Sequence, residues 1–266
     1  MKRFIVMLAM ATSFAFTACT KKTTVDDVVN QMVQAYGGAE KLAAVQDQVS
    51  TWDSKMVIAP GDSMITENAE TIITYKRPNK IKFEIKRPDG ATMVASGFDG
   101  DNGWYMLMGQ VRDMSAAEIQ ENTTLAETWI DQLYNYSQKG MKLALLADTT
   151  INGNSHHLIQ ATDRFNNMYK YYCNAKTDLI ERTAGEGTDP MSNQKKAYKM
   201  IFADFAAYDG LMVPQVVTSY NAADVMEFES TLKELKNNAG VTDDVFAKPA
   251  MPTAMENPAE QTAAKK

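Results

Sequence analysis

Two adjacent histidines, His156 and His157, are the only imidazole groups of the chain, and imidazole is the side chain used most readily as a general base or metal ligand. Neighbouring residues of a strand point to opposite faces, so the two rings are not expected to act on one substrate or hold one ion. The sequence contains no HExxH, GxSxG or GxxxxGK[ST] motif and no Cys–His cluster. We therefore predict a protein that is not an enzyme and has no cofactor and no metal site.

A short acidic loop, Asp99-Gly100-Asp101-Asn102-Gly103, has residue types that could bind calcium. An EF-hand calcium loop needs glycine at its sixth position and glutamate at its twelfth. Counted from Asp99, these positions hold Trp104 and Gln110. We therefore interpret the loop as a turn between two strands.

The N-terminal residues have the arrangement of a secretory signal peptide. Lys2 and Arg3 precede the apolar run Phe4–Phe16, which is too short to span a membrane comfortably. The sequence Phe16-Thr17-Ala18-Cys19 resembles a bacterial lipobox, with Phe16 in place of the usual aliphatic residue. This resemblance implies cleavage before Cys19 and lipidation of its thiol and amine.

The composition narrows the remaining classes of function. The chain of 266 residues has a formal net charge of -6, which does not suit a nucleic-acid binder. Cys173 is the only other cysteine, so lipidation of Cys19 would leave it without a disulfide partner. We expect Cys173 to be a small buried residue of a strand.

Two helices are predicted at the start of the domain. Residues 25–36 place an apolar residue on the same face at every turn, which indicates an amphipathic helix. Thr24 can cap this helix, and Gly37 and Gly38 end it. A second, shorter helix is expected over residues 39–45.

A third helical segment is predicted over residues 115–139. Ser115 and Glu118 have the spacing of a capping box. Four apolar residues follow at helical spacing and are expected to form one apolar stripe: Leu125, Trp129, Leu133 and Tyr136. This helix would cover one side of the sheet as a plug.

Most of the remaining chain alternates between apolar and polar residues, the pattern of strands with one dry and one wet face. Residues 66–98 are predicted to form an antiparallel meander, and further strands follow residue 150. The fold class is thus mainly β (α+β), with many antiparallel strands and a helical insertion. The predicted divisions are a signal peptide (1–18), a lipidated tether (19–24), one domain (25–248) and a disordered tail (249–266).

Aromatic and methionine side chains occur repeatedly on the apolar faces of these strands. In a large, barrel-like sheet such faces meet around an interior that holds either side chains or a ligand. The sequence leaves both alternatives open. The residues predicted to surround this interior are Trp52, Met56, Phe83, Phe98, Trp104, Met106, Leu125, Trp129, Leu133, Tyr172, Met200, Phe202, Met226 and Phe228.

A basic cluster between residues 76 and 87 is prominent in an acidic chain. One interpretation is a solvated outer face that protects the sheet from pairing with other chains. The other is a docking rim for acidic partners or lipid head groups, formed by Lys82, Lys86 and Arg87.

Several segments together resemble the outer-membrane lipoprotein-sorting proteins, the LolA/LolB-like superfamily. These segments are "AYGGAEKLAAVQ", "YKRPNKIKFEI", "FDGDNGWYM", "YYCNAKTDLIER", "YDGLMVPQVV" and "NNAGVTDDVFAKP", and they cover about residues 25–250. In the last of them, Phe246 is placed to lie against the sheet before a proline. The resemblance implies an incomplete antiparallel β-barrel whose concave face is covered by helices and holds acyl chains.

The resemblance leads to a functional expectation. The protein is expected to be an envelope lipoprotein that binds lipid or lipoprotein acyl chains, such as palmitate, for lipoprotein sorting or lipid transfer, together with an envelope transport partner. Thr20 follows Cys19 where an inner-membrane lipoprotein of enteric bacteria has aspartate, so we expect an outer-membrane anchor facing the periplasm. The alternative is a non-catalytic envelope scaffold with a filled core.

Overall fold

The structure is a computed structural model in which residues 23–58, 65–190 and 192–250 are described. Cys19, the predicted signal peptide, most of the predicted tether and most of the predicted tail lie outside these residues. Within the described ranges, no helix is both long enough and apolar enough to cross a membrane.

The first two helices, α1 (Val25–Ala35) and α2 (Ala39–Ala44), follow the sequence signals. Thr24 Oγ1 accepts a hydrogen bond from the amide of Asp27, and the Asp27 carboxylate accepts one from the amide of Thr24. This capping box satisfies amide donors that the first turn leaves free. The predicted apolar stripe is buried, which confirms the helix; its buried residues are Val28, Val29, Met32, Val33 and Tyr36.

The third helix is shorter than predicted. Helix α3 (Ala116–Thr128) begins at the predicted capping box, with the Glu118 amide donating to Ser115 Oγ. It ends at Thr128, and turns continue to Gly140. Gln132 and Asn135 have φ values of 48° and 53°, a left-handed conformation that interrupts a helix. The prediction of helix throughout residues 115–139 is therefore wrong in its second half.

Sixteen strands are assigned within the described residues, and most belong to one sheet. The strands before α3 are β1 (Asp47–Ile58), β2 (Ile65–Lys76), β3 (Lys80–Lys86), β4 (Thr92–Phe98), β5 (Gly103–Leu107) and β6 (Gln110–Asp113). Those after it are β7 (Lys142–Leu145), β8 (Thr149–Ile151), β9 (Asn154–Thr162), β10 (Met168–Asn174), β11 (Ile180–Thr188), β12 (Lys195–Ala203), β13 (Ala206–Tyr208), β14 (Leu211–Val213), β15 (Val216–Asn221) and β16 (Met226–Asn237).

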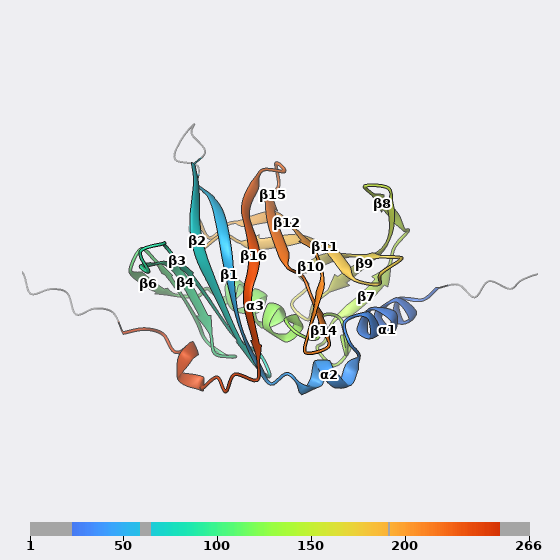
Figure 1. The fold of residues 1–266 in the computed structure, drawn as a ribbon, viewed down its shortest axis with the longest axis horizontal. Coiled ribbons are helices and arrows are strands. Elements are labelled where there is room, and N and C mark those ends of the chain that lie inside the picture. The colour runs from blue at the N-terminus through green and yellow to red at the C-terminus, as the bar shows by residue number, and fades with distance from the viewer. Residues whose placement is uncertain (1–22, 59–64, 191, 251–266) are drawn as a thin grey trace, which may run out of the picture.

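The large sheet is antiparallel and has the order β6-β5-β4-β3-β2-β1-β16-β15-β12-β11-β10-β9-β7, with β8 also paired to β9. The first and last long strands, β1 and β16, lie side by side, with Ser54 opposite Ser230. Strands β6 and β7 do not pair with each other, so the sheet curls without closing. The helices cover its concave face (Figure 1), which confirms the predicted incomplete barrel.

Two apolar clusters join the helices to the concave face. Helix α1 packs against strands β7, β9 and β10, where Ile159 and Cys173 are fully buried. Helix α3 packs against β3 and β4, where its Ala126 contacts Ile81 and Phe98. The buried position of Cys173 agrees with the prediction from the sequence.

The opposite, outer face is covered in part by the C-terminal strap, residues 238–250. Its short 3₁₀ helix η1 (Asp243–Phe246) packs on β3, and Phe246 is only 1% exposed. The Trp104 Nε1 donates to the carbonyl oxygen of Phe246 at 2.9 Å. A Cβ on Gly97 would lie 2.6 Å from that same nitrogen, so this glycine is what allows the indole to lie across β4.

Candidate ligand site between helix α3 and the sheet

The apolar side of the candidate site joins α3 to strands β2, β3 and β4. One apolar cluster there contains Ile119, Ala126 and Trp129, packed with Phe83 of strand β3. The rings of Phe83 and Trp129 meet edge to face at 5.8 Å, an arrangement that aromatic pairs favour. This is the part of the concave face at which an apolar ligand could replace helix contacts.

Helix α3 is unusual because most of its buried side chains are polar. They are Glu118, Asn122, Thr123, Thr124 and Thr128, beside the apolar Ala126. Asn122 Nδ2 and the hydroxyls of Thr123 and Thr128 donate to carbonyl oxygens one turn earlier in the helix. These bonds satisfy the polar groups within the helix itself. Helix α3 can therefore lie inside the open, curved sheet, which we call the half-barrel, with few apolar side chains of its own.

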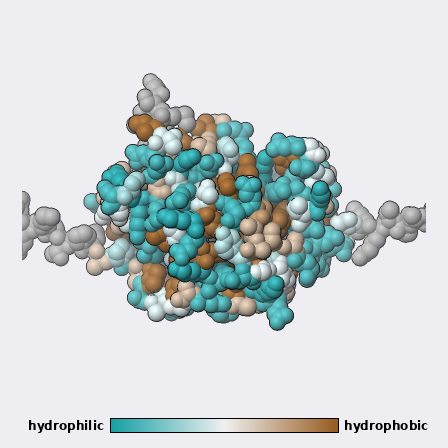
Figure 2. Space-filling view, in the orientation of Figure 1, coloured by the Kyte–Doolittle hydropathy of each residue, from teal (hydrophilic) through white to brown (hydrophobic). Residues whose placement is uncertain are grey.

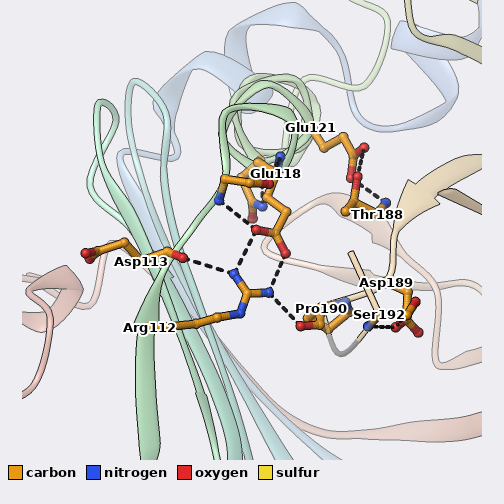
Figure 3. A network of polar contacts seen from close by, with 10 residues as sticks. Arg112, Asp113, Glu118, Glu121, Thr188, Asp189, Pro190 and Ser192 are labelled. Carbon is orange, nitrogen blue, oxygen red and sulfur yellow. Dashed lines mark hydrogen bonds and ion pairs between the residues drawn. The ribbon is translucent and has the colours of Figure 1, made fainter. Parts of the chain in front are cut away.

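The start of α3 is fixed by an ion pair at the edge of the sheet (Figure 3). Glu118, whose side chain is 0% exposed, accepts from Arg112 Nη1 at 2.9 Å and Nη2 at 2.6 Å, and from the Ser115 amide at 2.7 Å. Burial opposes the charge of Glu118, but these hydrogen bonds outweigh it and lower the pKa of the carboxyl. Arg112 also donates to the carbonyl oxygen of Pro190.

The rest of α3 is attached by further polar contacts to strand ends and turns around it. Glu121 accepts from the amide and the hydroxyl of Thr188, as Figure 3 shows, and also pairs with Lys195. Thr124 donates to Asp163 at 2.8 Å. A fourth contact, between Glu127 and Arg164 at 2.7 Å, completes the set. We call these four contacts and the Arg112–Glu118 pair the α3 attachments.

Three tyrosines occupy the concave face on the other side of α3. They were not predicted from the sequence. Tyr169, Tyr171 and Tyr198 share this face by strand register, across from Gly185 and Thr183 of β11. Burial raises the pKa of Tyr198 to about 12 and raises that of Tyr171 further. The alternation of Tyr169 and Tyr171 with Lys170 was the available signal for this surface.

Strand register places many of the predicted residues on the concave face. A row runs across the sheet from Met56 through Phe228, Ser219 and Met200 to Thr183, next to Tyr171. The predicted residues on this face are Trp52, Met56, Phe83, Phe98, Met200, Phe202 and Phe228.

Three predicted residues lie on the outer face instead, which contradicts their expected position. Trp104 and Met106 alternate with Tyr105, which is on the concave face opposite Ser96, and Trp104 packs under the C-terminal strap. Tyr172 points away from the interior and its ring lies 5.6 Å from the Arg182 guanidinium. Both faces of these strands are partly covered, so apolar character alone did not identify the inner one.

The predicted stripe of Leu125, Trp129, Leu133 and Tyr136 is not a single face. Leu125 is 39% exposed, whereas Leu133 is fully buried in the turns after α3. Trp129 is the C-cap of α3, and its Nε1 donates to Gln48 of β1. The early end of the helix breaks the spacing on which the stripe depended. Met226 lies half-buried at the start of β16, next to a register shift.

The floor of the half-barrel under these aromatics is made of small hydroxyl side chains. Ser54 is hydrogen-bonded to Ser230 at 2.7 Å and to Thr71 at 2.8 Å, which links β16, β1 and β2. Ser50 is also buried and accepts from Trp52 Nε1. The interior is therefore less apolar than the sequence led us to expect.

The residues of the predicted docking rim lie on the outer face or in a turn. Lys82 is paired with Glu84 at 3.2 Å, and its side chain is 18% exposed. Arg87 is exposed in the turn after β3, and Lys86 is half-buried. The neighbouring Lys76 and Lys80 both pair with Asp243 of the C-terminal strap, so part of the basic cluster is neutralised within the protein.

The two histidines point to opposite faces, as predicted. His156 contacts Glu181, and His157 contacts Asp148. Within the described residues, no group of three or more His, Cys, Asp or Glu side chains could hold a metal ion.

The described residues form, among others, two surface pockets with volumes of about 380 and 290 Å³. The first lies beside α1 and is mostly polar, with Asp27, His157 and Asp178 in its wall. The second lies near the ends of β9, β11 and β12. Phe202 is the only predicted ligand-binding residue that lines either pocket.

Comparisons with known proteins give a consistent result for the fold. No family model matches the sequence, and no curated protein matches it. A DUF1329 family protein from Desulfovibrio piger is similar in structure, with a TM-score of 0.56 and 12% identity, over 86% of this chain and 99% of that one.

Two further solved structures have comparable scores. A LolA superfamily protein from Nitrosomonas europaea has a TM-score of 0.55 and 12% identity, over 85% of this chain and 98% of that one. A protein domain from Vibrio parahaemolyticus, named for outer-membrane lipoprotein sorting, has a TM-score of 0.53 and 13% identity, over 83% and 94%. The half-barrel with its enclosed helix is therefore a LolA-like fold.

Proposed function

We propose that this protein binds lipid or lipoprotein acyl chains between α3 and the concave face of its sheet, for lipoprotein sorting or lipid transfer. The observation that carries the proposal is the character of α3. The helix occupies the interior, yet its buried side chains are mostly polar and its attachments lie at its ends and along one side. Such a helix can be displaced without dismantling an extensive apolar core.

The energetics of an acyl chain are compatible with this exchange. Burial of each methylene contributes about 0.8 kcal/mol, so a palmitoyl chain can contribute about 10 kcal/mol before the costs of binding. Displacement of α3 would expose Phe83, Ile81 and Phe98 to the chain. No catalytic residue is required for this function.

A lipid anchor at Cys19 would place the site beside the outer membrane, facing the periplasm, where a transport partner could supply the cargo. The lipobox-like sequence supports this part of the proposal. In cells fed labelled palmitate, the native chain is expected to incorporate label and fractionate with membranes. Cys19→Ser is expected to abolish both properties, and a variant that stays in the membrane fraction would refute the anchor.

Lipid binding is tested with the Cys19→Ser chain after removal of co-purified lipid. A fluorescent fatty acid is expected to bind saturably, and mass spectrometry of the untreated protein is expected to identify lipid. Phe83→Ser, on the concave face, should weaken binding at least tenfold. The control Met106→Ser, on the outer face, should change it less than twofold.

The alternative function is a non-catalytic envelope scaffold with a filled interior. It is favoured by one observation, which is that Ala126 of α3 packs directly against Ile81 and Phe98 of the concave face. A scaffold of this kind would neither retain lipid on purification nor bind the fluorescent probe saturably. That pair of results would reject the lipid-binding proposal.

A further inference from the structure

The pocket near the ends of β9, β11 and β12 is separate from the site under α3 and combines apolar and charged groups. Its volume is about 290 Å³, at the lower end of the range for small-molecule sites. Ile151, Ile201 and Phe205 supply apolar surface. Arg182, Glu181 and His156 supply charged or titratable groups. The pocket therefore suits a small ligand with one apolar and one polar end.

One wall of this pocket is fixed by a hydrogen-bonded group. His156 is 2% exposed, and its Nε2 lies 2.9 Å from Glu181 Oε2, while its Nδ1 lies 3.0 Å from the carbonyl oxygen of Asn154. Asn174 Nδ2 donates to the other oxygen of Glu181 at 2.8 Å. Both ring nitrogens and both carboxylate oxygens have partners, so these groups form a rigid wall.

Arg182 differs from its neighbours because part of its guanidinium has no hydrogen-bond partner within the described residues. The atom concerned is Nε, which is shielded from solvent. The guanidinium carbon of Arg182 lies 5.6 Å from the centre of the Tyr172 ring. The Asp224 carboxylate already accepts a hydrogen bond from Lys199. That bond, and to a smaller extent the charge of Arg182, lowers the pKa of Asp224. A partly buried guanidinium in this state favours an anionic ligand.

We propose that this pocket binds a small monocarboxylate that carries a branched apolar group. The carboxylate would accept hydrogen bonds from the fork of Arg182, and the apolar group would contact Ile201 and Phe205. A dianion such as inorganic phosphate is disfavoured, because the carboxylates of Glu181 and Asp204 also line the pocket and repel a dianion more strongly than a monoanion. The ligand is therefore a carboxylic acid, distinct from the acyl chains proposed for the interior.

The test uses the isotope-labelled Cys19→Ser chain and two probes that differ only in charge. N-acetyl-L-leucine is expected to shift the amide resonances of Ile201, Ala203 and Phe205 saturably. N-acetyl-L-leucinamide, which has the same shape without the negative charge, should bind at least tenfold more weakly. Inorganic phosphate at equal concentration should not displace the acid.

Variants then locate the charge that is responsible. Arg182→Gln is expected to weaken binding of the acid at least tenfold and to leave fluorescent fatty-acid binding unchanged. Lys170→Gln removes an exposed cation from the neighbouring strand and should leave both unchanged. Equal affinity for acid and amide in the Cys19→Ser chain would overturn the proposal, whether or not Arg182→Gln folds. So would shifts confined to residues outside the pocket.

Discussion

Replacement of Phe246 by alanine is expected to lower the free energy of unfolding by about 3–5 kcal/mol, the usual cost of removing a buried phenylalanine. Phe246 is 1% exposed and lies in the short helix that packs on β3. Its loss would leave a cavity beside Trp104 and release the C-terminal strap from the outer face. Urea denaturation followed by circular dichroism measures the change.

A matched control for this experiment lies two residues further along the strap. Lys248 pairs with Asp113 at 2.7 Å, but both side chains are exposed. Lys248→Ala should therefore cost no more than about 0.5 kcal/mol. If Phe246→Ala costs less than about 1 kcal/mol, the strap does not contribute to the stability of the sheet as we infer.

The second large effect is expected for Arg112→Ala, which should lower the free energy of unfolding at neutral pH by roughly 2–3 kcal/mol. The Glu118 side chain is 0% exposed and would remain buried without its cationic partner. We place the expected loss below that of a fully buried pair because the Arg112 side chain is 41% exposed. Chemical denaturation of both proteins measures the difference.

The pH dependence of the free energy of unfolding gives a second test of the Arg112–Glu118 pair. The Arg112 pair and the Ser115 hydrogen bonds lower the pKa of Glu118 in the folded state. The ionised Glu118 therefore stabilises the fold above the ordinary glutamate pKa. This stabilisation is lost as the pH falls through the lowered pKa of Glu118. The difference in the free energy of unfolding between the native protein and Arg112→Ala should therefore become smaller at acidic pH. In the double variant with Glu118→Gln, the loss should be smaller than the sum of the two single losses.

The sequence allowed the elements to be predicted wherever local signals determine them. Thr24 and Ser115 both cap the helices that they were expected to begin. Strict alternation around Phe83 identified both the strand and its inner face. These predictions succeeded because a cap or an alternating strand depends mainly on residues within a few positions.

Predictions that depended on distant parts of the chain were less successful. Trp104 was assigned to the interior because it is large and apolar, but a strap more than a hundred residues later covers the outer face at that point. The polar attachments of α3 were also missed, since Arg112, Thr188 and Asp163 come from three parts of the chain that are far apart in the sequence. No local pattern reveals which distant segments a helix will contact.

The open ends of the sheet have a consequence for the behaviour of the protein in solution. A sheet that does not close presents unpaired backbone groups at its edges, where another chain can add a strand and begin aggregation. Here the terminal strands are short: β6 and β7 have four residues each, and β8 has three. Such brief edges offer few hydrogen bonds to a second molecule, so the fold can remain open to a ligand with little risk of self-association.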